Sequence, residues 1–228
     1  MPDRDDLLRR LSRFEKQFFP RYEKTYRRLV DQGQQPKTLF IGCSDSRIVP
    51  YVLMDCGPGD LFIARNVGNL VPPWDMSAGF HGTAAAIEFA VLQLQVQNII
   101  VCGHSHCGAI RGLYEQPADE ARHLCQWLEL ARGAALPGPA STDVLRRVEQ
   151  RSIALQLERL MSYPMVASRV KEGRLFLHGW YYVIEEGQVQ VLDAGSGRFE
   201  PLPTQSATPP TAPPEIDAGH WGQLDPAR

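Results

Sequence analysis

Short apolar runs, each followed by a polar or glycine-containing turn, mark the strands expected along this chain. Runs of β-branched and large apolar residues are typical of buried strands. Strands are predicted at about 38–42, 61–64, 98–102, 175–177, 180–184 and 189–192, the last two as a hairpin around Glu185–Gln188.

Apolar residues at intervals of three or four predict helices before and between these strands. The first stripe predicts an N-terminal helical arm over about 3–31, interrupted near Pro20; its members are Leu7, Leu11, Phe14, Phe18, Tyr22, Tyr26 and Leu29. Further helices are predicted at about 79–95 (capped by Ser77 or a nearby residue), from near Cys107, at 119–133 and at 142–161. This succession predicts an α/β protein, with a central mostly parallel β-sheet, an antiparallel edge hairpin, flanking helices and the arm.

Length and composition limit the number of domains, the classes of partner and the compartment that the sequence suits. The 228 residues suit one α/β domain, expected over 1–201, and the Pro- and Ala-rich segment 202–228 predicts an extended or disordered tail, either inert or partner-binding. A net charge of −2 points to no nucleic-acid partner, and no apolar stretch suits a membrane span or a signal peptide. Five cysteines, an odd number, argue against a disulfide scaffold and for the cytoplasm, with Cys56, Cys102 and Cys125 as ordinary thiols.

Three metal-ligand side chains come directly after predicted strands. Cys43 follows the first strand, and His104 and Cys107 follow the strand that begins near residue 98. Sites of open α/β sheets lie past the carboxyl ends of the strands, so these side chains are expected to converge. Two thiols and one imidazole form a ligand set for catalytic zinc with one open position. The alternatives are buried structural cysteines and a closed four-ligand site, for which the usual close ligand pairs are lacking.

Five segments together resemble a known family. They are Cys43–Arg47, Gly59–Asn69, Gly82–Val91, Gly103–Gly108 and Leu177–Tyr182. Their sequences and order resemble the β-class carbonic anhydrases, in particular plant and cyanobacterial members, over roughly residues 5 to 200. The resemblance implies one zinc ion per chain, held by Cys43, His104 and Cys107. It also implies reversible hydration of CO₂ to bicarbonate and a proton by attack of zinc-bound hydroxide. A further implication is a homodimer or a dimer-based homo-oligomer, such as a tetramer, in which the arm embraces a neighbouring subunit.

Asp45 and Arg47 are the candidate catalytic pair. Their spacing lets the guanidinium grip the carboxylate with two hydrogen bonds beside the metal, so that the carboxylate can orient the attacking oxygen. The resemblance assigns the same pair to catalysis. His106, between two ligands, is interpreted either as a proton shuttle or as a solvent-facing loop residue, and His178 and Trp180 as packing residues.

The resemblance also implies a substrate pocket and an open site. The pocket residues are Gln34, Phe62, Val67, Phe80 and Gly108. In an open site Arg47 holds Asp45 away from the metal, whereas in a closed site Asp45 becomes the fourth ligand. Members that switch have a Trp where this chain has Phe40, although Arg65 and Tyr182 match the rest of their bicarbonate pocket.

Three other functions remain open at this point. A hydrolase of CS₂ or COS would use the same fold and a similar pocket. A non-catalytic module would close its zinc with a fourth protein ligand. A thiol redox protein is a third possibility, but the chain has no Cys-x-x-Cys motif.

Overall fold

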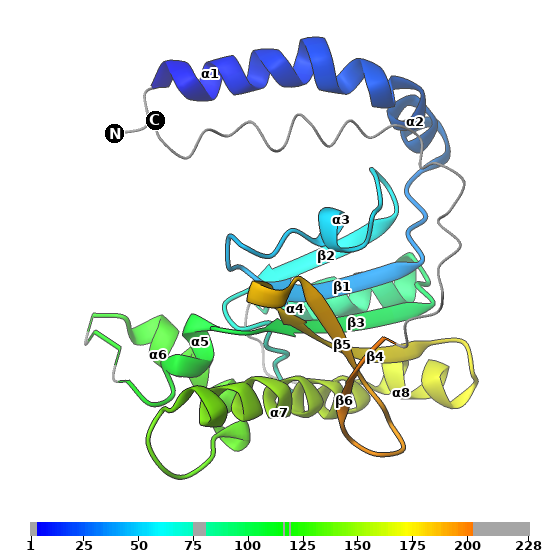
Figure 1. Ribbon diagram of the computed structural model, residues 1–228. Helices are drawn as coiled ribbons and strands as arrows, with labels where there is room; N and C mark the ends of the chain where they lie inside the picture. The colour runs from blue at the N-terminus through cyan, green and yellow to red at the C-terminus, as the bar shows by residue number, and fades with distance from the viewer. Residues whose placement is uncertain (1–3, 75–80, 116, 119, 203–228) are drawn as a thin grey trace.

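A six-stranded sheet forms the centre of the molecule (Figure 1). The computed structural model describes residues 4–74, 81–115, 117–118 and 120–202. The strands are β1 (Thr38–Cys43), β2 (Leu61–Asn66), β3 (Asn98–His104), β4 (Phe176–Val183), β5 (Gln188–Leu192) and β6 (Phe199–Pro201). Their order is β2-β1-β3-β4-β5-β6, with the first four parallel and the last two antiparallel. The predicted fold class is confirmed.

Both faces of the central strands are buried, because helices cover the sheet from two sides. Alternate residues point to opposite faces. On one face, Leu39 and Val101 belong to a core shared with Ile153 of helix α7 (Thr142–Met161). On the other, Phe40 and Ile100 pack near the short helix α3 (Pro50–Leu53). The uninterrupted apolar runs are therefore explained by burial on both faces.

One predicted break in the sheet is wrong. The sequence predicted separate strands at 175–177 and 180–184, but β4 runs unbroken through Gly179 and pairs with β3 along its whole length. A Cβ at Gly179 would lie 3.1 Å from side-chain atoms of Ile153, Leu157 and Leu192, so this glycine allows close packing rather than a turn. The hairpin between β4 and β5 is confirmed, and its turn ends at Gly187 with a φ of 63°.

The helices match the predicted segments with shifted ends. α7 coincides with 142–161 and is capped by Ser141, whose side chain accepts a hydrogen bond from the Val144 N–H. The other predicted helices correspond to α4 (Gly82–Glu88) with η2 (Phe89–Gln93), α5 (Gly108–Arg111), and α6 (Arg122–Leu128) with η3 (Glu129–Ala134). The prediction missed α3, α8 (Pro164–Lys171) and β6, which are short or begin with proline. The Ser77 cap and the tail beyond Leu202 lie outside the described residues.

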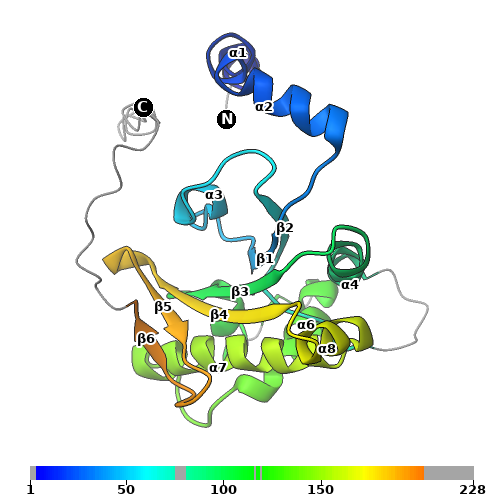
Figure 2. The same cartoon turned by 90° about the vertical axis from the view of Figure 1, so that its right-hand side faces the viewer.

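The N-terminal arm extends away from the sheet (Figures 1 and 2). It consists of α1 (Arg4–Arg13), the π-helical segment η1 (Phe14–Phe18) and α2 (Phe19–Gln32). Pro20 lies in the first turn of α2, where its missing N–H costs little, so the helical path continues past it. Several apolar side chains of the arm are exposed, including Leu11 at 60% and Phe14 at 43%. None of the described helices is long and apolar enough to cross a membrane.

Candidate metal centre and active site

Cys43, His104 and Cys107 meet at one edge of the sheet. Cys43 ends β1, His104 ends β3, and Cys107 lies in the turn that follows, so the pairing of two adjacent parallel strands brings the three together. Their ligand atoms all lie within 4.8 Å of one another, and each residue is at most 5% exposed. Among the described residues, these three form the complete group, without a fourth His, Cys, Asp or Glu.

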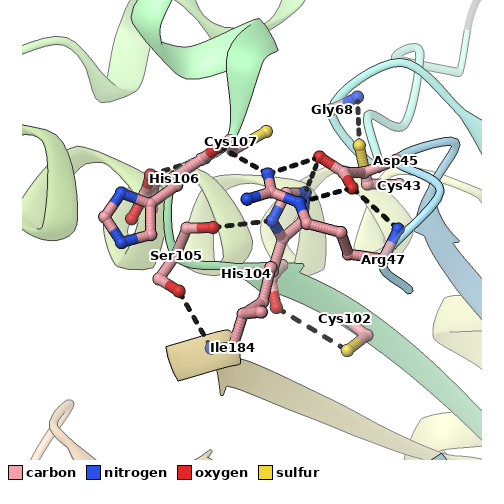
Figure 3. Close-up of polar contacts among 12 residues, drawn as sticks. Cys43, Asp45, Arg47, Gly68, Cys102, His104, Ser105, His106, Cys107 and Ile184 are labelled. Carbon is pink, nitrogen blue, oxygen red and sulfur yellow. Dashed lines mark hydrogen bonds and ion pairs between the residues drawn. The ribbon is translucent and has the colours of Figure 1, made fainter. Parts of the chain in front are cut away.

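The His104 ring is oriented as a metal ligand. Its Nδ1 lies 2.8 Å from the Ser105 carbonyl oxygen, which assigns the ring proton to Nδ1 (Figure 3). The buried Nε2 has no hydrogen-bond partner among the described residues, so its lone pair is available toward the two sulfur atoms. A ligand histidine held by a carbonyl at its other nitrogen is the usual arrangement at metal sites. The donor set therefore fits a zinc ion.

The two thiols differ in pKa because they share a hydrogen bond. The bond from Cys107 lowers the pKa of Cys43 well below the usual value of a thiol, whereas the same interaction and burial raise the pKa of Cys107. The Gly68 N–H, 3.4 Å from the Cys43 sulfur, also favours the Cys43 thiolate. Burial alone would lower the pKa of His104, but the Cys43 thiolate and the Ser105 carbonyl raise it overall. A divalent cation would replace the shared proton and stabilise both thiolates.

Arg47 grips the Asp45 carboxylate next to this cluster. Nε lies 2.9 Å from Oδ1 and Nη2 lies 2.7 Å from Oδ2, and the Arg47 N–H adds a third bond to Oδ1. These donors hold the pKa of Asp45 well below its usual range. Oδ2 is also 3.9 Å from Nε2 of His104, so the carboxylate borders the ligand cluster. Nη2 further donates to the His106 carbonyl, at 3.0 Å, and so joins the two ligand-bearing loops.

Comparison with known proteins accounts for this arrangement. A family model described as carbonic anhydrase matches residues 38–189. The carbonic anhydrase of Pseudomonas aeruginosa is 37% identical over 203 residues, 86% of this chain and 91% of that protein. The carbonic anhydrase of Synechococcus elongatus is 36% identical over 80% of this chain and 69% of that protein. Among solved structures, the β-carbonic anhydrase CcaA has a TM-score of 0.79 and 36% identity, covering 87% of this chain and 98% of CcaA.

The chain belongs to the β-class carbonic anhydrase family. The resemblance stated from its motifs is confirmed, and the matched region contains all three members of the metal cluster.

Two of the pocket residues expected in a β-carbonic anhydrase lie together beside the metal cluster. Val67, just past the end of β2, and Gly108, next to Cys107, both line a cavity of about 240 Å³. Leu124 and Leu128 of α6 form part of its apolar wall. The Trp127 indole N–H donates to the Val67 carbonyl at 2.7 Å and ties α6 to the loop after β2.

Two other expected pocket residues, Phe62 and Gln34, lie apart from the cluster within one chain. Phe62 stacks on Phe89. It lies four residues before Asn66, the strand partner of Cys43, and four residues of a strand span about 13 Å. Gln34 is exposed in the segment between α2 and β1. Phe80 lies outside the described residues. Whether these side chains serve the pocket stays a prediction.

The remaining histidines and the extra cysteine have other surroundings. His106 is half exposed, has a φ of 57°, and places Nε2 3.3 Å from Glu185. His178 bonds Asn98 at 2.9 Å between neighbouring strands. Cys102 is buried beside Trp180, and burial raises its pKa to about 12, which suits an inert thiol.

Three polar residues support the loops through contacts that were not identified from the sequence. Arg65 donates to the carbonyl oxygens of Cys43 (2.9 Å) and Asp45 (2.7 Å), although sequence comparison had associated it with a bicarbonate pocket. Ser105 donates to Glu185 at 2.6 Å, and this bond contributes to lowering the pKa of Glu185 to about 2. Glu149 of α7, whose pKa burial raises, accepts a hydrogen bond from the Cys107 N–H. All three contacts join distant segments, and no local motif marks them.

Proposed function

We propose that this chain is a zinc-dependent carbonic anhydrase that interconverts CO₂ and bicarbonate. The observation that carries the proposal is a buried cluster of Cys43, His104 and Cys107 next to a paired Asp45 and Arg47, in a member of this family. The three residues would hold one zinc ion through two sulfur atoms and Nε2. When bound, zinc lowers the pKa of a water molecule in its open position and so supplies a nucleophile near neutral pH.

Asp45 and Arg47 would orient the attacking oxygen. The two hydrogen bonds from the guanidinium fix the plane of the carboxylate, and the low pKa of Asp45 keeps it ionised at neutral pH. Oδ1 already accepts two hydrogen bonds from Arg47, whereas Oδ2 accepts only one, so Oδ2 keeps a lone pair for a hydrogen bond from the attacking oxygen. That bond turns a lone pair of the oxygen toward the carbon of CO₂.

The cavity beside the cluster suits a small apolar substrate. CO₂ carries no charge and needs no ionic anchor, and Val67, Leu124 and Leu128 offer it apolar surface. CS₂ and COS share these properties, so the choice among them depends on turnover measurements. The test is stopped-flow CO₂ hydration with zinc content measured on the same sample. Zinc without CO₂ hydration, but with CS₂ or COS hydrolysis, would favour the alternative hydrolase, and a lack of stoichiometric zinc would favour a thiol redox protein.

An open site is expected in the zinc-loaded protein near pH 8. Asp45 is already engaged by Arg47, and the described residues offer no fourth ligand to the cluster. A crystal structure at this pH should show water or a substrate-like anion at the fourth position, with the Asp45–Arg47 pair intact. An Asp45 oxygen within zinc-bond distance, ~2.0–2.2 Å, and a broken pair would contradict this prediction and favour a closed site.

The arm supports a homodimer or an assembly of dimers. Leu7, Leu8, Leu11 and Phe14 are each more than two-fifths exposed on α1 and η1, where a second subunit would bury them. A second copy would also be needed to bring Phe62 to a metal cluster, given its distance from the cluster of its own chain. Structural neighbours from Sordaria macrospora, 28% identical with a TM-score of 0.63, are described as tetrameric.

Deletion of residues 1–30 is expected to give monomers or aggregates, because the remaining body loses the apolar surface that joins the subunits. Analytical ultracentrifugation of the full chain and of the deletion measures this directly. The milder variant Leu11→Asp should weaken the assembly, whereas Arg13→Asp, an exposed polar position two residues away, should not. A soluble and active dimer formed by the truncated protein would show that the arm is dispensable.

A further inference from the structure

The turn that carries Cys107 depends on contacts from outside the ligand cluster. His106, directly before Cys107, has a left-handed backbone with a φ of 57°, which few residues other than glycine adopt. The Cys107 N–H points into the protein interior just before α5 and is not used by that helix. An unpaired donor in this position would be unfavourable, so the conformation of the turn depends on an acceptor supplied from elsewhere.

Glu149 supplies that acceptor from the middle of α7. Its side chain is only 3% exposed, and Oε1 lies 2.9 Å from the Cys107 nitrogen. The other oxygen, Oε2, accepts a hydrogen bond of 2.7 Å from the hydroxyl of Tyr181 on β4. No lysine or arginine in the described part of the chain forms an ion pair with this carboxyl. Its burial is therefore offset by the two hydrogen bonds, one of which ends on a metal-ligand residue.

We propose that Glu149 is a positioning residue of the metal centre, where its Oε1 fixes the main chain of Cys107 and thereby the direction of the Cys107 sulfur. Tyr181 holds the carboxyl in the orientation that makes this contact. The inference rests on the proposed zinc site but adds a residue that is neither a ligand nor a member of the Asp45–Arg47 pair. Zinc–sulfur bonds have a narrow optimum near 2.3 Å, so a sulfur whose main chain shifts binds the ion less tightly.

Four substitutions separate this role from a general structural one. Glu149→Met removes the acceptor but keeps an unbranched side chain of similar length. Glu149→Gln keeps one oxygen for the Cys107 N–H and turns its amide toward the Tyr181 oxygen, which can accept. Tyr181→Phe leaves the carboxyl in place without its second hydrogen bond. Glu158→Gln is the control, since Glu158 lies on the exposed side of the same helix.

Metal binding gives the readouts. Zinc affinity is measured by competition with a chelator, and the thiolate-to-metal charge-transfer band is recorded on the cobalt(II) form. Glu149→Met should lose about 10–100-fold in zinc affinity, the usual effect of removing a partner of a metal ligand, and should shift the cobalt band. Glu149→Gln and Glu158→Gln should stay close to the parent protein, and Tyr181→Phe should fall between the parent and Glu149→Met.

The outcomes distinguish this inference from the proposed function. A parent protein that binds neither zinc nor cobalt would overturn both. Parental zinc affinity and a parental cobalt spectrum in Glu149→Met would overturn the inference but not the proposed function. A loss of zinc affinity in Glu149→Gln equal to that in Glu149→Met would also overturn it, because the negative charge rather than the hydrogen-bond acceptor would then be responsible. If circular dichroism shows that Glu149→Met does not fold, the Tyr181→Phe variant provides the test. A parental cobalt spectrum in that variant would overturn the positioning role proposed for Glu149 and Tyr181.

Discussion

Replacing Cys43 and Cys107 together by alanine is expected to remove the zinc ion and nearly all CO₂ hydration. The double substitution leaves His104 as the one remaining member of the cluster, and a single imidazole does not retain zinc against dilution. A catalytic metal contributes several kcal/mol to transition-state stabilisation, so the rate should fall on the order of 10³-fold or more. Metal analysis and stopped-flow CO₂ hydration on the same preparation measure both effects.

The matched control replaces two cysteines that lie elsewhere. Cys56→Ala with Cys125→Ala also removes two thiols, both partly buried and outside the cluster, and should retain one zinc per chain and the parental rate. Full zinc occupancy in the Cys43→Ala, Cys107→Ala protein would refute the assignment of the site. Loss of zinc in the control would show instead that the thiols act on the fold as a whole.

Asp45→Asn or Arg47→Ala should keep the fold and most of the zinc but lose at least ~100-fold in turnover, the usual scale for a positioned proton acceptor or the group that orients it. Neither residue belongs to the metal cluster, so zinc binding is expected to persist. Asparagine cannot accept from both guanidinium nitrogens, because one side of its amide is a donor. Removal of Arg47 leaves the carboxylate free to rotate away from the attacking oxygen.

An exposed ion pair that also joins a carboxylate and a guanidinium provides the control for these variants. Arg27 and Glu23 form a solvent-exposed ion pair on α2, with Nη2 of Arg27 2.7 Å from Oε1 of Glu23. Glu23→Gln or Arg27→Ala should leave turnover unchanged, because such surface pairs contribute little to stability. Steady-state rates normalised to bound zinc separate an effect on turnover from an effect on metal content. Near-parental rates per zinc in Asp45→Asn would mean that the Asp45–Arg47 pair is structural.

The ligand cluster could be predicted because its chemistry is local to strand ends. Cys43 and His104 end apolar strands and Cys107 lies in the turn after His104, so the pairing of two adjacent parallel strands brings the three together. The Asp45–Arg47 pair is equally local, since two residues of spacing suffice for the bidentate contact. By contrast, the contacts of Glu149 and Glu185 depend on how α7 and the β4–β5 turn pack against β3, and sequence spacing contains no information on that packing.

The error in the predicted strand around Gly179 also arises from packing between segments remote in the sequence. The sequence predicted separate strands on either side of Gly179, yet this glycine lies inside β4, where α7 and Leu192 closely approach the backbone. A neighbour remote in the sequence therefore determines what this residue does. Periodicity and motif matching detect such neighbours poorly.

The position of Arg47 has a consequence for any switching of the site. Its Nη2 donates to Asp45 and also to the His106 carbonyl, in the turn between two ligands. If Asp45 rotated toward the metal, the Arg47 guanidinium would lose its carboxylate partner. The His106 carbonyl would then be its one remaining hydrogen-bond acceptor among the contacts described above. Inactivation would therefore be a concerted event in two loops rather than the flip of one side chain. Each molecule would then be in one of two discrete arrangements, and an effector would act by changing the fraction of molecules in each.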